Sequence, residues 1–450
     1  MILKIKYLLQ KVGIDGAIAY SVLAKLLQAV GGVISVFFIA KYLTKQEQGY
    51  YYTFGSILAI QIFFELGLST IITQFVAHEK VHLQWSDNTT LIGNERALSR
   101  LASLLQFCVK WFLGIALCLV IILVIAGFIF FAKYGKDDSS VMWQIPWIIL
   151  SVLTAINLMV SPIFAFFEGL GKVKDIAKIR FIQQCIQLLG TFLFLMVGFK
   201  LYASPLAAML TAIIAPIWIL FSYRKQLLRS IWYGWGEYIV NYRLEIFPYQ
   251  WRIAVSWISG YFIFQLFNPV LFATEGATVA GQMGMTLAAL NGVLSISLSW
   301  INTKVPLFSS LIAKKDYQIL DLVFNKTILQ ASLICAICLG VLILGVYELQ
   351  YTQHPIGNRF LPVLLVTLLA SCVFVNQIVS ALATYLRCHK EEPFLIISIV
   401  MGVLTACSTL ILGNYFGING IVGGYSFLTL FVSLTWAGYI FKTKREEWHQ

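Results

Sequence analysis

Twelve apolar stretches dominate the 450-residue sequence, and each is about as long as the roughly 20 residues that a helix needs to cross a bilayer. They are 16–40, 53–77, 104–132, 143–167, 178–198, 201–223, 249–272, 279–303, 327–349, 360–386, 394–412 and 418–440. Only 12% of the residues are charged, against about 25% in a soluble protein, so a soluble enzyme is excluded. The sequence predicts an all-α polytopic membrane protein of about twelve transmembrane helices.

The basic residues between these stretches predict how the chain is oriented. If the N-terminus is cytoplasmic, the segments on that side hold 22 Lys and Arg residues and the opposite loops hold 6. Short cytoplasmic loops carry such an excess of Lys and Arg. Both termini are therefore expected in the cytoplasm. The net charge of +12 is explained by these loops, because no basic run is long enough for a nucleic-acid-binding arm.

One basic, aromatic loop divides the sequence into two halves of six stretches each. We expect a first six-helix lobe over 1–223, a cytoplasmic amphipathic linker over 224–248 and a second six-helix lobe over 249–450. The linker is rich in Trp and Tyr, which favour a membrane interface. The runs QGYYYTFGSILAI (48–60) and AGQMGMTLAAL (280–290) resemble each other weakly and suggest related halves.

Ionisable residues inside the apolar stretches are the main candidates for a functional site, because charge within a membrane is costly. Four are cations and one is an acid: Lys25, Lys110, Arg252, Lys304 and Glu65. One interpretation is that the cations extend to the interface and that Lys25 pairs with Glu65. The other is a cationic, substrate-binding cavity that accepts an anionic head group. The sequence leaves both open.

Polar uncharged side chains occur at helical spacing in the same stretches. Gln28 shares a helix face with Lys25, and Gln184 and Gln187 share one face of the fifth stretch. Asn376 lies in the tenth stretch. Such side chains either hydrogen-bond neighbouring helices or line a polar cavity. With Glu65, these four form the predicted polar lining.

Enzyme motifs are weak. The string HEKVH (78–82) has the spacing of a zinc-binding H-E-x-x-H motif. It begins where a predicted helix leaves the membrane, and no downstream sequence resembles a metalloprotease. Glu95 is the only nearby acidic residue in a suitable range for a third ligand, so chance spacing is the better interpretation. No Walker A string and no Ser-His-Asp set can be assembled. We therefore predict no catalytic residue, no metal site and no cofactor.

Three segments carry a resemblance to a known family: EQGYYYTFGSILAIQIFFELGLSTIITQF (47–75), FFEGLGKVKDIAKIR (166–180) and the run 280–316. Together with the twelve-stretch layout they resemble the bacterial flippases that export O-antigen or capsular polysaccharide repeat units. This polysaccharide transporter family belongs to the superfamily of multidrug, oligosaccharidyl-lipid and polysaccharide exporters. The resemblance implies two six-helix lobes in a V-shaped, alternating-access arrangement in the bacterial inner membrane.

The resemblance also implies the substrate. Members of the family move an undecaprenyl-diphosphate-linked glycan from the cytoplasmic to the periplasmic leaflet, among membrane lipids and alongside glycan polymerase machinery. A diphosphate suits Lys and Arg side chains. Coupling to an H⁺ or Na⁺ gradient is left open by the sequence. The alternatives are a cation or drug antiporter of the multidrug and toxic-compound extrusion type, which would favour acidic residues, and a membrane glycan polymerase or ligase, for which a large periplasmic loop is missing.

Overall fold

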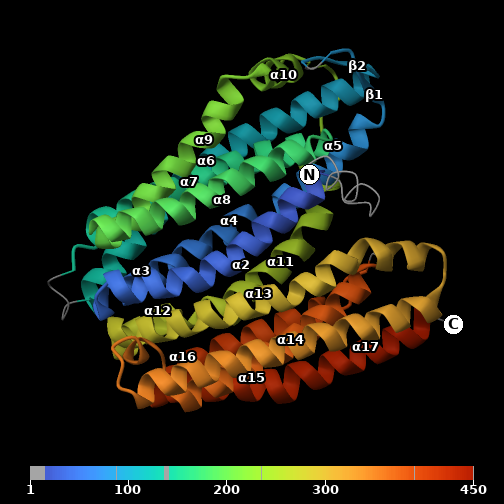
Figure 1. Cartoon of the computed structure of the whole chain (residues 1–450). Coiled ribbons are helices and arrows are strands. Elements are labelled where there is room, and N and C mark those ends of the chain that lie inside the picture. Colours follow the sequence, from blue (N-terminus) through green and yellow to red (C-terminus); the bar gives the residue numbers. More distant parts are fainter. Residues whose placement is uncertain (1–15, 88, 136–140, 235, 390, 449–450) are drawn as a thin grey trace, which may run out of the picture. The chain divides into compact units, whose positions relative to one another are not determined.

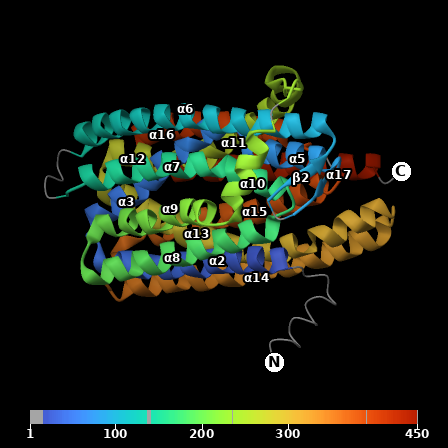
Figure 2. The ribbon, with the colours of Figure 1, turned by 90° about the horizontal axis from the view of Figure 1, so that it is seen from above.

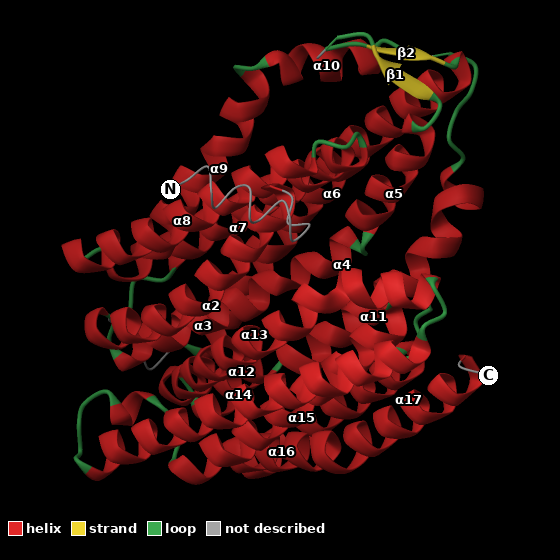
Figure 3. Ribbon diagram, turned by 45° about the vertical axis from the view of Figure 1, so that its right-hand side comes forward, coloured by secondary structure: helices red, strands yellow, loops and turns green. Residues whose placement is uncertain are grey.

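The computed structural model describes residues 16–87, 89–135, 141–234, 236–389 and 391–448, apart from a few side chains such as those of Lys25 and Arg252. Almost all of these residues are helical, with a single strand pair (Figure 3). The elements are α2 (Gly16–Tyr42), α3 (Lys45–Leu58), η1 (Ala59–Gln61), α4 (Ile62–Glu65), α5 (Leu68–Lys80), β1 (Leu83–Trp85), β2 (Leu91–Gly93), α6 (Glu95–Tyr134), α7 (Gln144–Gly169), α8 (Val173–Val197), η2 (Lys200–Tyr202), α9 (Ala203–Leu220), α10 (Tyr223–Trp232), η3 (Tyr242–Ile246), α11 (Phe247–Phe264), α12 (Phe267–Glu275), α13 (Ala277–Ala313), α14 (Tyr317–Tyr351), η4 (Gly357–Arg359), α15 (Val363–Arg387), α16 (Leu395–Phe427), η5 (Leu428–Ser433) and α17 (Leu434–Trp448).

The predicted all-α membrane fold is confirmed. Within the described residues, 9 helical stretches are long and apolar enough to cross a membrane, or 10 with a bent pair in the first half. The number differs from twelve for two reasons. The last two predicted spans form one 54-residue stretch, Leu395–Trp448, interrupted only by the non-helical backbone of Gly417. The apolar part of α2 that could be evaluated, Val30–Tyr42, is shorter than a full span.

The described chain forms two compact units. Of the described residues, unit 1 comprises those within Met1–Leu27, Leu58–Lys133 and Met142–Trp257, and unit 2 those within Gln28–Ile57, Tyr134–Val141 and Ile258–Gln450. The chain passes from one unit to the other within α2, within the second span and within α11. The second half of α2 and most of α3 therefore pack with the C-terminal helices, although the sequence places them in the first half.

Unit 1 is a helical bundle in which α7 packs against α5, α8 and α9. Figures 1 and 2 both show α8 and α9 side by side. The contact between α6 and α7 depends on Trp147, which is fully buried and donates from Nε1 to the carbonyl of Leu123 at 3.1 Å. A Cβ at Gly127 would lie 2.0 Å from that nitrogen, so only glycine leaves room for the indole.

Unit 2 has its hydrophobic core between α13, α14, α15 and α17. Phe308, Phe324 and Tyr385 are buried in it. The Phe324 ring meets Phe308 edge to face and Tyr385 at a tilt, with ring centroids 5.9 and 4.6 Å away. The end of α17 is fastened to α14 by Arg445, whose Nη2 lies 2.7 Å from Asp321. The carboxylate also accepts a 2.7 Å bond from the Tyr385 hydroxyl.

The two similar runs found in the sequence contact each other inside unit 2, where α3 meets the first turns of α13. A Cβ at Gly49 would come within 1.9 Å of the carbonyl oxygen of Ala277, and one at Gly281 within 2.9 Å of the Gly49 nitrogen. Gln48 donates to the Gly281 carbonyl at 2.8 Å. The glycines of both runs are therefore explained by close helix packing.

The predicted amphipathic linker is helical only in part. Leu227 and Ile231 of α10 are buried, while Lys225 and Arg229 are exposed. Beyond α10, residues 236–246, which we term the strap, lie along α6. Ser99 accepts from the Gly236 amide at 3.0 Å and donates to the Tyr238 carbonyl at 2.8 Å. Ser103 accepts from the Val240 amide at 2.9 Å.

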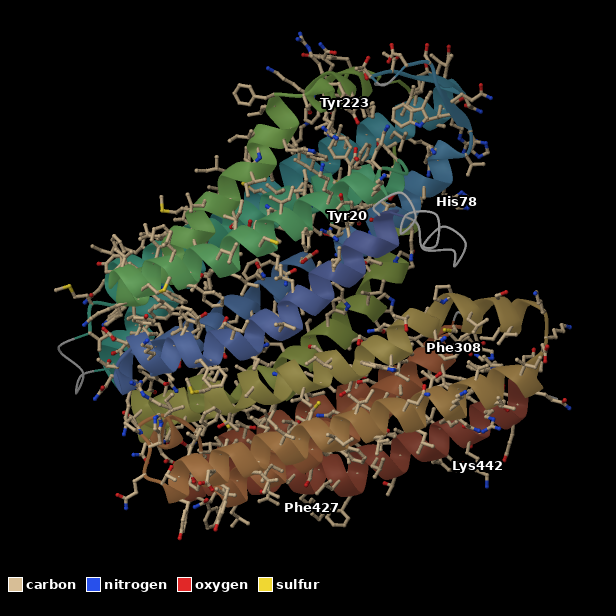
Figure 4. All side chains as sticks on the ribbon, viewed as in Figure 1. Tyr20, His78, Tyr223, Phe308, Phe427 and Lys442 are labelled. Atoms are coloured by element: carbon tan, nitrogen blue, oxygen red, sulfur yellow. The ribbon has the colours of Figure 1, made fainter. Side chains whose placement is uncertain are left out.

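The loop before α6 contains a feature that the sequence did not suggest. Strands β1 and β2 form an antiparallel hairpin in which Gln84 pairs with Ile92. The hairpin is tied to α10 by Ser230, which donates to the Thr89 carbonyl at 2.8 Å. Figure 4 labels two residues at this end of unit 1, His78 at the end of α5 and Tyr223 at the start of α10.

Candidate functional site

The second span is broken next to its acidic residue. Helix α4 ends at Glu65, and Leu66 and Gly67 both have left-handed backbone conformations, with φ of 49° and 68°. A non-glycine residue in this region is strained, and such strain collects at functional sites. The helices before and after the break differ in direction by 41°. Two features favour glycine at position 67. Its φ is positive, and a Cβ there would lie 2.3 Å from the Ile253 side chain.

Polar side chains gather around the Glu65 carboxylate, and all of them belong to unit 1. Ser161 of α7 donates to Glu65 Oε1 at 3.2 Å. Its hydroxyl also lies 2.8 Å from that of Ser69, in the first turn of α5. Thr73, one turn further along α5, bonds the carbonyls of Ser69 and Ala165 at 3.1 Å each. A hydroxyl network thus links the break to α7.

This arrangement gives the carboxylate two chemical options. The amino end of α5 begins directly after the break, and no side chain caps it. The positive end of a helix dipole stabilises a nearby carboxylate. Glu65 is half-buried, and together with the hydroxyls of Ser69 and Ser161 it can also offer oxygen ligands to a hard cation. Broken spans form the ion and substrate sites of many transporters.

The structure places the predicted cations as follows. Lys110 is exposed on α6 in unit 1, and Lys304 is exposed on α13 in unit 2. Lys25 lies on α2 and Arg252 on α11, both in segments of unit 1, but their side chains are outside the described residues. An exposed lysine fits both interpretations, because a cation that extends to the interface and one that lines a cavity are each accessible. The cationic site therefore stays a prediction. So does the predicted pair of Lys25 and Glu65.

Of the residues predicted to form a polar lining, two are at least partly accessible and two join neighbouring helices. Gln28 is exposed on α2, and Gln184 is half-buried on α8. Gln187 joins α8 to α9, because its Oε1 accepts from Thr211 at 3.4 Å. Asn376 of α15 donates to the Tyr425 hydroxyl of α16 at 2.9 Å. The last two residues are thus used in contacts between helices of the same unit.

A second ionic cluster lies where α5 ends. Arg100 of α6 donates to Glu79 at 2.7 Å and to Glu245 of the strap at 2.5 Å. These bonds from Arg100 are the main cause that lowers the pKa of Glu245. The cluster gives Glu79, the glutamate of the HEKVH string, a partner other than a metal. In the described part of the chain, no group of three or more His, Cys, Asp and Glu side chains is arranged to hold a metal ion.

Sequence reasoning found Glu65 but missed its surroundings. The run FELGLST contains the signal of the break, since glycine followed by Ser and Thr often ends one helix and begins another. Nothing in the sequence indicates that Ser161, 96 positions away, reaches Glu65. The ionic cluster was missed because it joins residues 145 positions apart.

No protein-family model matches the chain, and no curated protein sequence matches it. Among solved structures, an inward-facing multidrug resistance transporter of the MATE family, in the MOP superfamily, aligns over 95% of this chain and 96% of its own at 14% identity, with a TM-score of 0.67. The lipid II flippase MurJ, in an inward closed conformation, aligns over 95% of this chain and 89% of its own at 14% identity, with a TM-score of 0.61.

A third structure is a MOP superfamily transporter from Pyrococcus furiosus Vc1 (DSM3638) whose binding pocket has reverse polarity. It aligns over 97% of both chains at 13% identity, with a TM-score of 0.52. At such identities the likeness concerns the fold. The protein is a multi-pass, all-α membrane protein with the fold shared by MATE transporters of the MOP superfamily and the lipid II flippase MurJ.

Proposed function

We propose that the protein is a flippase that moves an undecaprenyl-diphosphate-linked oligosaccharide, such as an O-antigen or capsule repeat unit, from the cytoplasmic to the periplasmic leaflet by alternating access. The observation that carries this proposal is the combination of a fold shared with the lipid II flippase MurJ and four cations against one acid in the predicted spans. A diphosphate is the ligand that such a charge balance favours.

The orientation is part of the proposal. The excess of 22 to 6 basic residues supports cytoplasmic termini in a bacterial inner membrane. Reporters fused after Gly135 and Asn358 should report a periplasmic location. Reporters fused after Lys174, Gly234 and Lys444 should report a cytoplasmic location. A cytoplasmic signal at Gly135 would refute the orientation.

Lys25 is the first residue to test for substrate binding. Lys25→Ala should abolish surface glycan in a complemented strain, while Lys25→Arg should retain part of it, because a diphosphate requires positive charge more than one side-chain geometry. Lys326→Ala, at an exposed lysine of α14, is the matched control and should keep full export. Normal glycan display by Lys25→Ala, at normal protein level, would exclude Lys25 from the site.

A double variant separates substrate binding from a simple ion pair. If Lys25 only neutralises Glu65, each single removal leaves an unpaired charge that typically costs about 3–5 kcal/mol. Lys25→Met combined with Glu65→Leu would then restore both stability and export. If Lys25 binds the diphosphate, the double variant should be stable but inactive, and this is the result we expect. Normal export by the double variant would assign Lys25 a structural role.

The second candidate is a cation-coupled multidrug antiporter. It is favoured by the likeness to the MATE transporter and by the position of Glu65 at a broken span. In that case Glu65→Gln should abolish drug resistance without affecting glycan, whereas a flippase coupled through Glu65 should lose glycan export. Measuring both phenotypes in one strain distinguishes the two functions.

A further inference from the structure

A pocket of about 520 Å³ opens in unit 2 between the last turns of α13 and α15. This volume is within the range of about 300–1,000 Å³ that small-molecule sites occupy. None of the residues predicted for substrate binding lines it. The lining residues are Val305, Ser309 and Ile312 of α13, Thr384 and Arg387 of α15, and Cys388 and His389 just beyond α15.

The α13 wall of the pocket is held by the core of unit 2. Phe308 and Leu311 alternate with the lining residues along the helix and are buried in that core. Figure 4 labels Phe308 on the last part of α13. Because one face of this stretch is packed on Phe324, the neighbouring face with Val305, Ser309 and Ile312 is kept open.

The α15 wall is fixed at three successive points. The Tyr385 hydroxyl donates to Asp321 of α14 at 2.7 Å. Arg387 donates from Nε and Nη2 to the carboxylate of Glu392, at 2.7–3.0 Å. The His389 ring stacks on Trp448 of α17, with centroids 4.6 Å apart. Tyr385 and His389 thus anchor this wall to α14 and α17, as expected for a preformed binding site.

The pocket has the polarity of a lipid at the membrane interface. Val305 and Ile312 give it apolar surface, while Ser309 and Arg387 give it a hydroxyl and a guanidinium. Two candidate spans, identified by length and composition, end here, at Ile312 and Arg387, so the pocket lies at the end of the membrane-spanning helices, toward the phosphate head groups. The guanidinium is about half exposed and has five N–H donors, so the bonds to Glu392 leave donors for a second acceptor.

We propose that this pocket binds one phospholipid. The phosphate accepts hydrogen bonds from Arg387 and Ser309, and the upper part of an acyl chain lies against Val305 and Ile312. Arginine is suited to this role because its fork matches two phosphate oxygens. Glu392 holds the guanidinium in place before the lipid arrives. The proposal does not depend on which substrate the protein transports.

The test uses the purified full-length protein in detergent, with phosphatidylglycerol as the probe. Native mass spectrometry should show one tightly retained lipid. Arg387→Gln should weaken its binding about tenfold, since a charge-assisted hydrogen bond is lost. Ser309→Leu should reduce binding at least as much, because it fills the pocket. Lys442→Gln, an exposed cation on α17 outside the pocket, is the matched control and should bind like the wild type.

A second measurement needs no mutation. Cys388 lines the pocket. Phosphatidylglycerol should slow the reaction of N-ethylmaleimide with Cys388, as read by peptide mass spectrometry, and diacylglycerol at the same concentration should not. This readout remains valid if a variant fails to fold.

Three outcomes would overturn the proposal. One is equal lipid retention by the wild type, Arg387→Gln and Ser309→Leu, with no protection of Cys388. Another is equal protection by inorganic phosphate alone, which would make the pocket a site for a free anion. The third is equal protection by diacylglycerol, which lacks the phosphate and would show that only the chain is recognised.

Discussion

A broken helix in unit 1 and a helix contact in unit 2 are stabilised by different kinds of interaction. Unit 1 has a strained break at Leu66 and Gly67, a carboxylate that accepts from a serine, and a cluster that joins Arg100 to two glutamates. In unit 2, α3 and α13 approach so closely at Gly49 that a Cβ has no space. Glycine contacts of this kind are fixed by shape, whereas the contacts around the break depend on polar and charged groups.

This difference predicts that the two regions behave differently when the protein changes conformation. A network of hydroxyls and carboxylates can change with protonation or ion binding, because each bond contributes only about 1 kcal/mol. A backbone contact without space for a methyl group has one arrangement only. We therefore expect conformational change in unit 1 to begin around Glu65, and the α3–α13 contact of unit 2 to move as a block.

The largest expected effect is at that contact. Gly49→Ala places a Cβ against the Ala277 carbonyl, and overpacking of this kind costs about 3 kcal/mol. Gly55→Ala is the matched control on the same helix, because nothing lies within 4 Å of its Cβ position. It should stabilise the helix by about 0.5–1 kcal/mol. Thermal unfolding in detergent checks both, and equal midpoints would show that the contact yields easily.

Features that depend on the local residue pattern could be predicted from the sequence. The apolar stretches predicted the membrane class, and all twelve fall largely on described helices, although only 9 or 10 helical stretches of the described residues qualify as spans. Glu65 was recognised because an acid within an apolar run is conspicuous. The α3–α13 contact was not predicted, because the two glycine-rich runs lie more than 200 residues apart in sequence and only the fold brings them together. The passage of the chain from unit 1 to unit 2 within α2, and back to unit 1 within the second span, was missed for the same reason.

The next largest effect is the loss of stability when the arginine of each ionic cluster is replaced. Arg100 is 15% exposed and serves two glutamates in unit 1, whereas Arg445 is 38% exposed and serves one aspartate in unit 2. Arg100→Ala leaves two carboxylates unpaired and should cost about 2 kcal/mol, below the cost at a fully buried pair. Arg445→Ala should cost about 1 kcal/mol or less. A larger loss for Arg445→Ala would show that burial and the number of carboxylate partners do not determine what these two arginines contribute.

A smaller effect is expected at the break. Ser161→Ala removes the hydrogen bond to Glu65 and the contact with Ser69, which should cost about 1 kcal/mol. Ser151→Ala is the control on the same helix, since its hydroxyl donates only to the Trp147 carbonyl one turn away. It should change the unfolding midpoint less. If both variants behave alike, the hydroxyl network around Glu65 does not stabilise the break.

The smallest effect is a pH dependence of the strap. Arg100 lowers the pKa of Glu245 in the folded protein, so Glu245 stabilises the strap above its unfolded pKa of about 4.3 and loses this contribution as the pH falls through the lower, folded value. The pair is partly exposed to solvent, which limits the effect to less than about 1 kcal/mol. Proteolysis between residues 236 and 246 should accelerate as the pH is lowered below about 4.3, measured with an acid-active protease. Glu245→Gln should be cut faster already at neutral pH, measured with a second protease that is active there, and should lose most of the additional acceleration in acid. If its acid response equals that of the wild type, the strap is held by the serines of α6 alone and the ionic cluster does not contribute.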